Sequence, residues 1–207
     1  MRTSFRIVLA WALLLIVGAC SAPTVPDVTY YRLPPPAPLP RSDKPLSLLP
    51  IEVSTFRGEG IYSEQALIYA TTPEAGALRA YHYQLWSESP SSGLQAHLIA
   101  MLREAGVSSL VTERLPASNQ ALRVRSQILH YERVKKGDSA FVASVAFSMR
   151  VEQDDGEPLL EQNYRAEQPA ADAAMESTVK AFGLAVDQAF GAFYKDLVAL
   201  RSGPHAG

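Results

Sequence analysis

The chain has 207 residues, of which 47% are hydrophobic and 19% are charged, so it has enough apolar residues to build one domain with a core. Its formal net charge is −2 and it has no block of Lys and Arg, which excludes the basic footprint of a nucleic-acid-binding protein. A single cysteine excludes both an intramolecular disulfide framework and a multi-cysteine metal site.

The first part of the chain has the features of a secretory signal. Two arginines precede an apolar run at 7–17, which is shorter than the roughly 20 residues that a membrane-spanning helix needs. Glycine and alanine then precede Cys20, and this pattern resembles a bacterial lipobox. In such signals the cysteine thiol is diacylated with palmitate-type chains, the peptide is cut before it, and the new amine is acylated. We therefore predict a signal peptide at 1–19 and lipidation at Cys20, with an ordinary signal and a coincidental cysteine as the alternative.

A proline-rich segment follows the cysteine. Proline fixes φ and donates no hydrogen bond, so residues 22–45 are predicted to be mostly extended. Residues 28–33 are β-branched and aromatic without proline, which indicates a short edge strand and leaves 20–27 as the lipidated cysteine and tether. Ser21 stands where an Asp would resemble an inner-membrane retention signal, so the predicted location is the periplasmic face of the outer membrane.

Three further strands are predicted before the first helix. The segment 46–56 is a candidate for a buried strand, although it carries a proline. The segments 66–71 and 77–86 also have strand composition, and residues 73–76 make a plausible hairpin turn between them.

The change of period after these strands predicts a helix. One stripe, spaced as on a helix, contains Leu94, His97, Leu98, Met101, Leu102 and Ala105. Ser92 and Gln95 match a capping box, and Gly106 is a suitable C-terminal stop.

Alternating apolar residues predict a three-stranded meander in the second half. Two strands are expected at 122–129 and 141–151, with a turn at 135–139 between them. The acidic turn at 154–156 leads to a third strand at about 158–166, and short turns of this kind indicate antiparallel pairing.

A long final helix is predicted between Asp172 and a Gly203-Pro204 stop. Its apolar face contains Met175, Val179, Phe182, Val186, Phe190, Phe193, Leu197 and Leu200. The order in outline is ββββ-α-ββββ-α. It predicts a single α+β domain at 28–202, with two main helices packed on a mostly antiparallel sheet, and a tail at 203–207.

No motif for catalysis or metal binding is found. The histidines His82, His97, His130 and His205 form no H-E-x-x-H and lie at no metal-ligand spacing, and His97 is expected in the core or at its boundary. Nucleophilic-serine and phosphate-loop motifs are missing as well, and the carboxylates at 154–157 are interpreted as solvated turn residues. We therefore predict no enzymatic activity, no metal and no cofactor.

Three aromatic residues stand out in the fourth predicted strand: Tyr81, Tyr83 and Trp86. Alternate residues on a strand point to one face, so Tyr81 and Tyr83 are expected to lie together. The favoured interpretation is a sheet face packed under a helix, and the alternative is a surface that contacts a partner or lipid.

Four features occur in a particular order along the chain. They are the lipobox, "YYRLPPP" at 30–36, "LSLLPIEV" at 46–53 and "YHYQLWSESPSSGLQAHLIAML" at 81–102. Together they resemble the ABC-type transport auxiliary lipoproteins of the PqiC/YmbA-like group. The stretch "FRGEGIYSE" at 56–64 departs from the apolar "P-x-Y-L" type segment that this family often has.

The resemblance implies a non-enzymatic lipoprotein of the outer membrane that serves lipid transport across the envelope and so contributes to outer-membrane integrity. The implied partners are an MCE-domain protein and an inner-membrane ABC transporter or permease, and some relatives form homo-oligomeric rings. The alternative is a structural lipoprotein that stabilises another envelope machine, for outer-membrane assembly or cell-wall synthesis. A hydrolase would need a nucleophile–base pair that we do not find in the sequence.

Overall fold

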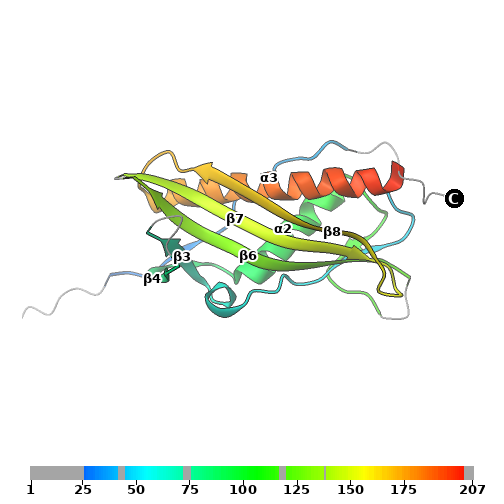
Figure 1. The fold of residues 1–207 in the computed structure, drawn as a ribbon, viewed down its shortest axis with the longest axis horizontal. Helices are drawn as coiled ribbons and strands as arrows, with labels where there is room; N and C mark the ends of the chain where they lie inside the picture. Colours follow the sequence, from blue (N-terminus) through cyan, green and yellow to red (C-terminus); the bar gives the residue numbers. More distant parts are fainter. Residues whose placement is uncertain (1–25, 42–44, 72–75, 117–119, 138, 203–207) are drawn as a thin grey trace, which may run out of the picture.

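A single sheet with two helices makes up the part of the chain that the computed structural model describes, residues 26–41, 45–71, 76–116, 120–137 and 139–202 (Figure 1). Its elements in chain order are β1 (Thr29–Tyr31), β2 (Ile51–Val53), the 3-10 helix η1 (Gly60–Ser63), β3 (Ala66–Ala70), β4 (Leu78–Trp86), α2 (Pro90–Glu104), β5 (Val111–Thr112), β6 (Leu122–Lys136), β7 (Ala140–Glu152), β8 (Pro158–Pro169) and α3 (Met175–Ser202). The predicted α+β class, the two main helices and their order among the strands are confirmed.

The long strand β6 organises the sheet. It pairs antiparallel with β7 along its length, and β7 pairs antiparallel with β8. On its other side the start of β6 pairs with β2 and its end pairs with β3, both in parallel. Because β4 and β1 continue from β3 and β5 continues from β2, β1 and β5 lie at opposite ends of the strand path β1-β4-β3-β6-β2-β5.

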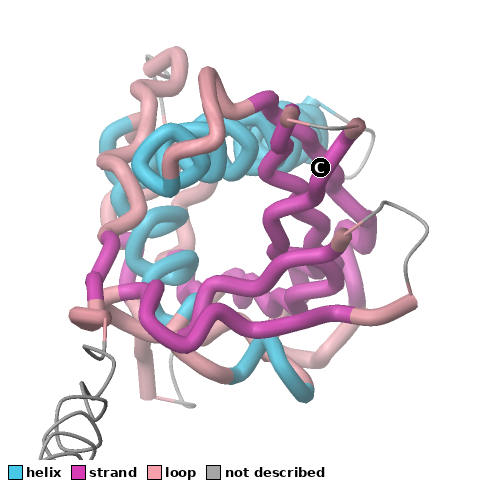
Figure 2. Tube along the Cα trace, turned by 90° about the vertical axis from the view of Figure 1, so that its left-hand side faces the viewer, coloured by secondary structure: helices cyan, strands magenta, loops and turns pink. Residues whose placement is uncertain are grey.

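Both helices pack on one face of the sheet, here called the inner face, and the strands curve around them (Figure 2). Alternation along β7 turns Val145, Phe147 and Met149 toward this face, where all three are buried. Phe190 of α3 packs against Phe147 with ring centroids 5.3 Å apart, so the centre of the core lies between α3 and the meander. Among the described residues, no helix is both long enough and apolar enough to cross a bilayer.

The helix α2 begins earlier than the sequence pattern predicts. Ser89 is the N-cap, its Oγ accepts from the Ser92 backbone N–H at 3.3 Å, and Pro90 occupies the first turn. Gln95 is buried and donates through Nε2 to the Val53 carbonyl at 2.8 Å, so it does not cap the helix. The predicted Ser92–Gln95 capping box is therefore wrong, because proline loses nothing at the first helical position, where N–H groups have no partner within the helix.

Two strands differ in length from the prediction. Within 46–56 only Ile51–Val53 form a strand, because residues before Pro50 bend to bond with the loop after α2. In contrast, β6 runs on to Lys136 through a bulge between Ile128 and His130. Before the bulge the even-numbered residues Val124 and Ile128 face the core, and after it the odd-numbered Tyr131 does. This shift ends the regular alternation of apolar residues that the sequence shows. The predicted turn at 73–76, except for Gly76, and the Gly203-Pro204 stop lie outside the described residues.

The proline-rich segment is attached to α3. The Ala37 N–H donates to Asp187 Oδ2 at 3.1 Å, and the Tyr194 hydroxyl donates to the Pro40 carbonyl at 2.8 Å. A Cβ placed on Gly183 of α3 would lie 2.9 Å from Pro34 Cγ. These contacts make residues 34–40 part of the folded domain.

The two glycines of α3 provide a matched test of this packing. We expect Gly191→Ala to raise the free energy of unfolding by about 0.5–1 kcal/mol, since alanine is the better helix former and the nearest contact is 3.9 Å away. Gly183→Ala should lose this gain or destabilise the protein, because its new methyl group meets the rigid ring of Pro34. Urea unfolding measures both variants, and equal stabilisation would contradict the packing.

Candidate functional site

The structure separates the three aromatic residues of β4. Trp86 is only 4% exposed and packs on Tyr131 and Phe182, with ring centroids 5.4 and 5.3 Å away. Tyr81 is half-buried with its ring 4.5 Å from that of Tyr69, whereas Tyr83 is exposed. Trp86 is therefore part of the core and not of a partner or lipid surface. The expectation that Tyr81 and Tyr83 lie together is wrong, because Tyr81 packs against the core while Tyr83 faces water. The pairing of β3 with β4 is irregular between Ala80 and Leu85, so the regular alternation does not continue from Tyr81 to Tyr83.

A buried arginine hydrogen-bonds to the hydroxyl of Tyr81. Arg133 of β6 donates through Nη1 to the Tyr81 hydroxyl at 2.8 Å and through Nη2 to the Ala173 carbonyl at 2.6 Å. Its guanidinium carbon lies 3.5 Å from the centroid of the Phe141 ring, which adds a cation–π contact. Sequence reasoning singled out Tyr81 but missed this cluster, because Arg133, Phe141 and Ala173 are brought to Tyr81 only by the tertiary fold.

The histidines take structural positions. His97 is buried and its Nε2 lies 2.7 Å from Oδ1 of Asp187, the residue that also holds the proline-rich segment. The prediction of a satisfied core histidine is confirmed there. His130 is on a strand as expected, His82 is exposed on β4, and His205 lies outside the described residues. In the described part of the chain, no three His, Cys, Asp or Glu side chains lie close enough together to hold a metal ion.

A depression on the outer face, away from the helices, contains a polar group that sequence reasoning missed. Glu132 is buried there, and its Oε2 accepts from the Tyr62 hydroxyl of η1 at 2.7 Å. His130 Nδ1 lies 3.1 Å from the other carboxylate oxygen. Burial, followed by the bond to Glu132, raises the pKa of Tyr62 above its ordinary value, so this phenol stays a neutral donor.

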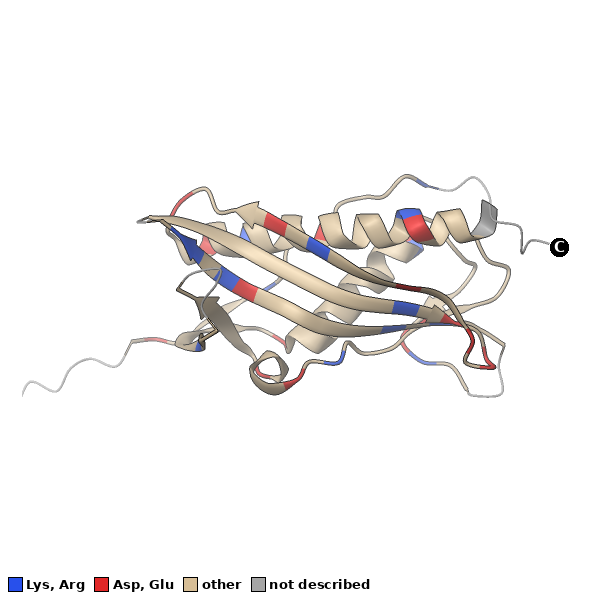
Figure 3. Ribbon diagram, in the orientation of Figure 1, with Lys and Arg blue, Asp and Glu red and all other residues tan. Residues whose placement is uncertain are grey.

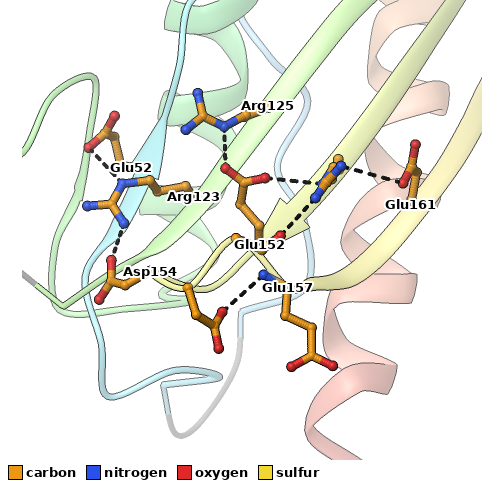
Figure 4. Close-up of polar contacts among 10 residues, drawn as sticks. Glu52, Arg123, Arg125, Glu152, Asp154, Glu157 and Glu161 are labelled. Atoms are coloured by element: carbon orange, nitrogen blue, oxygen red, sulfur yellow. Dashed lines mark hydrogen bonds and ion pairs between the residues drawn. The ribbon is translucent and has the colours of Figure 1, made fainter. Parts of the chain in front are cut away.

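Charged side chains on the outer face of the meander pair with one another (Figure 4). Arg125 and Arg150 lie directly opposite on β6 and β7, and Glu152 forms ion pairs with both, with Arg150 Nε at 3.1 Å. Arg123 bonds to Asp154, so that carboxylate is held by an ion pair and is more than a solvated turn residue. Because like charges opposite each other destabilise a sheet, Glu152 stabilises the pairing of these strands. Acidic and basic residues are mixed along this face (Figure 3).

Comparison with known proteins identifies the family. The model of the family described as "ABC-type transport auxiliary lipoprotein component" matches residues 31–191, from the end of β1 into α3. The chain belongs to this family. The predicted membership of the auxiliary lipoproteins is thus confirmed.

Two crystal structures share the fold of this auxiliary lipoprotein. Protein XCC0632 from Xanthomonas campestris, of the family DUF330, is 14% identical with a TM-score of 0.71, over 84% of this chain and 97% of that one. A second, described as an uncharacterized protein, is also 14% identical with a TM-score of 0.61, over 83% and 99% of the two chains. At this identity the likeness supports the fold alone. No curated protein gives a significant match.

The family match places the candidate sites of the auxiliary lipoprotein in two groups. Tyr81, Tyr83 and Trp86 lie within the matched residues, and only Tyr83 among them is exposed. Cys20 precedes the match and lies outside the described residues, so its lipidation stays a prediction from the lipobox.

Proposed function

We propose that this protein is a lipid-anchored periplasmic subunit that docks an MCE-type, ABC-transporter-linked lipid transport system at the outer membrane, and thereby contributes to outer-membrane integrity. The observation that carries the proposal is the family match over residues 31–191. The lipobox-like sequence that ends shortly before this match adds a means of attachment.

The proposed attachment has a simple physical basis. Removal of residues 1–19 leaves Cys20 at the N-terminus, where a thiol and an amine together accept three acyl chains. Each buried methylene contributes about 0.8 kcal/mol, so one chain binds only marginally while several hold the protein stably. Residues 20–27 then form the tether, 28–202 the periplasmic domain and 203–207 a tail.

The proposed role is that of a binding subunit and not of an enzyme. Two features support it. His97, a residue type that often serves as a catalytic base, is enclosed in the core. His130 is paired with the buried carboxylate of Glu132, which also accepts a hydrogen bond from Tyr62. The partners we propose are an MCE-domain protein and, through it, an inner-membrane ABC transporter or permease. Assembly of several copies into a homo-oligomeric ring belongs to the same proposal.

Affinity purification from detergent-solubilised envelopes tests the partner. A tag placed on the 203–207 tail should recover an MCE-domain protein after mild cross-linking, identified by mass spectrometry. The matched control is tagged Cys20→Ala, which should lose most of this recovery if anchoring presents the domain to its partner. Recovery of an outer-membrane assembly factor or a cell-wall synthase in its place would favour a structural lipoprotein, and recovery of no envelope protein would contradict both functions.

A further inference from the structure

Large apolar side chains are exposed along the edge formed by β1 and β4. Tyr30 is 61% exposed, Val28 46% and Tyr83 37%. Thr29 pairs with Gln84 and Tyr30 with Leu85, so Val28 comes next to Tyr83 in the same register. In the described part of the chain, these three residues are half of the large hydrophobic residues that are exposed. We call Val28, Tyr30 and Tyr83 the β1 patch.

The packing of β1 explains why this patch faces water. Tyr31 turns to the inner face, packs against the core and donates through its hydroxyl to Gln84 Oε1 at 2.7 Å. Alternation along the strand then directs Tyr30 to the opposite side. β1 is the outermost strand at this end of the sheet path, and Tyr30 on its outward side is 61% exposed.

The position of the patch along the chain suggests what covers it. Cys20 and Val28 are eight residues apart, so a fully extended chain places them at most about 29 Å from each other. β1 is therefore the described strand closest along the chain to the proposed lipid anchor. The tether therefore lets the β1 patch reach the surface of the bilayer that holds the anchor.

The chemistry of the patch fits the headgroup region of a bilayer. Tyrosine combines an apolar ring with a hydroxyl, and for this reason it is enriched where hydrocarbon meets water. One acidic and one basic residue, Asp27 and Arg32, are exposed on either side of β1, so their opposite charges give no electrostatic preference for anionic lipid. A contact here depends on apolar and aromatic burial.

We propose that Val28, Tyr30 and Tyr83 rest in the headgroup region of the same bilayer that holds Cys20, which turns the β1–β4 edge toward the membrane and leaves the opposite, β5 end of the sheet path toward the periplasm. This inference rests on the proposed lipidation of Cys20. It adds an orientation, which the attachment by a tether alone does not provide.

Tryptophan substitution in the reconstituted protein tests the orientation. The protein, expressed from its whole gene and purified in detergent, is placed in vesicles of phosphatidylethanolamine and phosphatidylglycerol that carry brominated acyl chains. Tyr30→Trp and Tyr83→Trp probe the patch. Leu110→Trp is the matched control, because Leu110 is 44% exposed and lies directly before β5. Trp86, the only tryptophan after Cys20, is buried and gives a common background.

The expected result is a blue-shifted emission and strong bromine quenching at positions 30 and 83, with neither at position 110. Equal bromine quenching at all three positions, or equal access of aqueous acrylamide to them, would overturn the inference. Protection of positions 30 and 83 from acrylamide without bromine quenching would also overturn it, because protein and not lipid would then cover the patch. If the protein does not float with the vesicles and its mass shows no acyl chains, the proposed anchor fails and the orientation fails with it. Flotation without selective quenching removes only the orientation.

Discussion

Phe190→Ala is expected to lower the free energy of unfolding by about 3–5 kcal/mol. Phe190 has no exposed surface and lies at the meeting point of several elements. Its ring centroid is 5.6 Å from that of Phe56, 5.3 Å from that of Phe147 and 5.9 Å from that of His97. Truncation therefore leaves a cavity between α2, α3, β7 and the segment after β2, and these elements cannot all move inward to fill it.

Urea unfolding followed by circular dichroism measures this loss. Leu184→Ala is the matched control, since Leu184 is on the same helix but is 57% exposed, and its truncation should change the stability by no more than about 0.5 kcal/mol. A domain of this kind has about 5–15 kcal/mol in total, so the loss at Phe190 is a large part of it. Similar losses for the two variants would mean that α3 is not packed against the sheet as described.

Regular periodicity allowed most of the fold to be predicted. The apolar stripes of α2 and α3 and the alternation in β7 are signals within one segment, and all three elements formed in the expected segments, with an earlier start for α2. Prediction failed where geometry departs from the repeat. The bulge between Ile128 and His130 interrupts the alternation of β6, and the irregular pairing of β3 and β4 places Tyr81 against the core while Tyr83 is exposed.

Pairs of residues far apart in the sequence could not be predicted. Tyr62 and Glu132 meet across the outer face, and His97 meets Asp187 across the two helices, in each case through the tertiary fold. Alternation indicates that Tyr30 and Tyr31 face opposite sides of a strand, but it does not indicate which of the two sides is covered. Tyr30 and Tyr31 are identical in the sequence, yet one faces water and the other bonds to Gln84. The candidate membrane contact therefore needed the structure, whereas the candidate lipidation site needed only the sequence.

Cys20→Ala is expected to abolish membrane anchoring and to leave a soluble domain that still folds. The substitution removes the only thiol in the chain, so the acyl chains have no sulfur to be attached to. The core lies between Ile51 and Leu197, far along the chain from this position, so thermal unfolding of the domain should be unchanged. Membrane flotation followed by immunoblotting measures the loss.

Ser21→Ala is the matched control for this experiment, because it changes the neighbouring residue and keeps the thiol. It should remain wholly in the membrane fraction, since three acyl chains bind regardless of the side chain beside them. The apolar run at 7–17 is too short to replace them as a spanning helix. If Cys20→Ala still sediments with membranes, then either the β1 patch binds lipid strongly by itself or a protein partner holds the domain. Adding Tyr30→Ser and Tyr83→Ser to Cys20→Ala separates these cases, because only binding by the patch would then be lost.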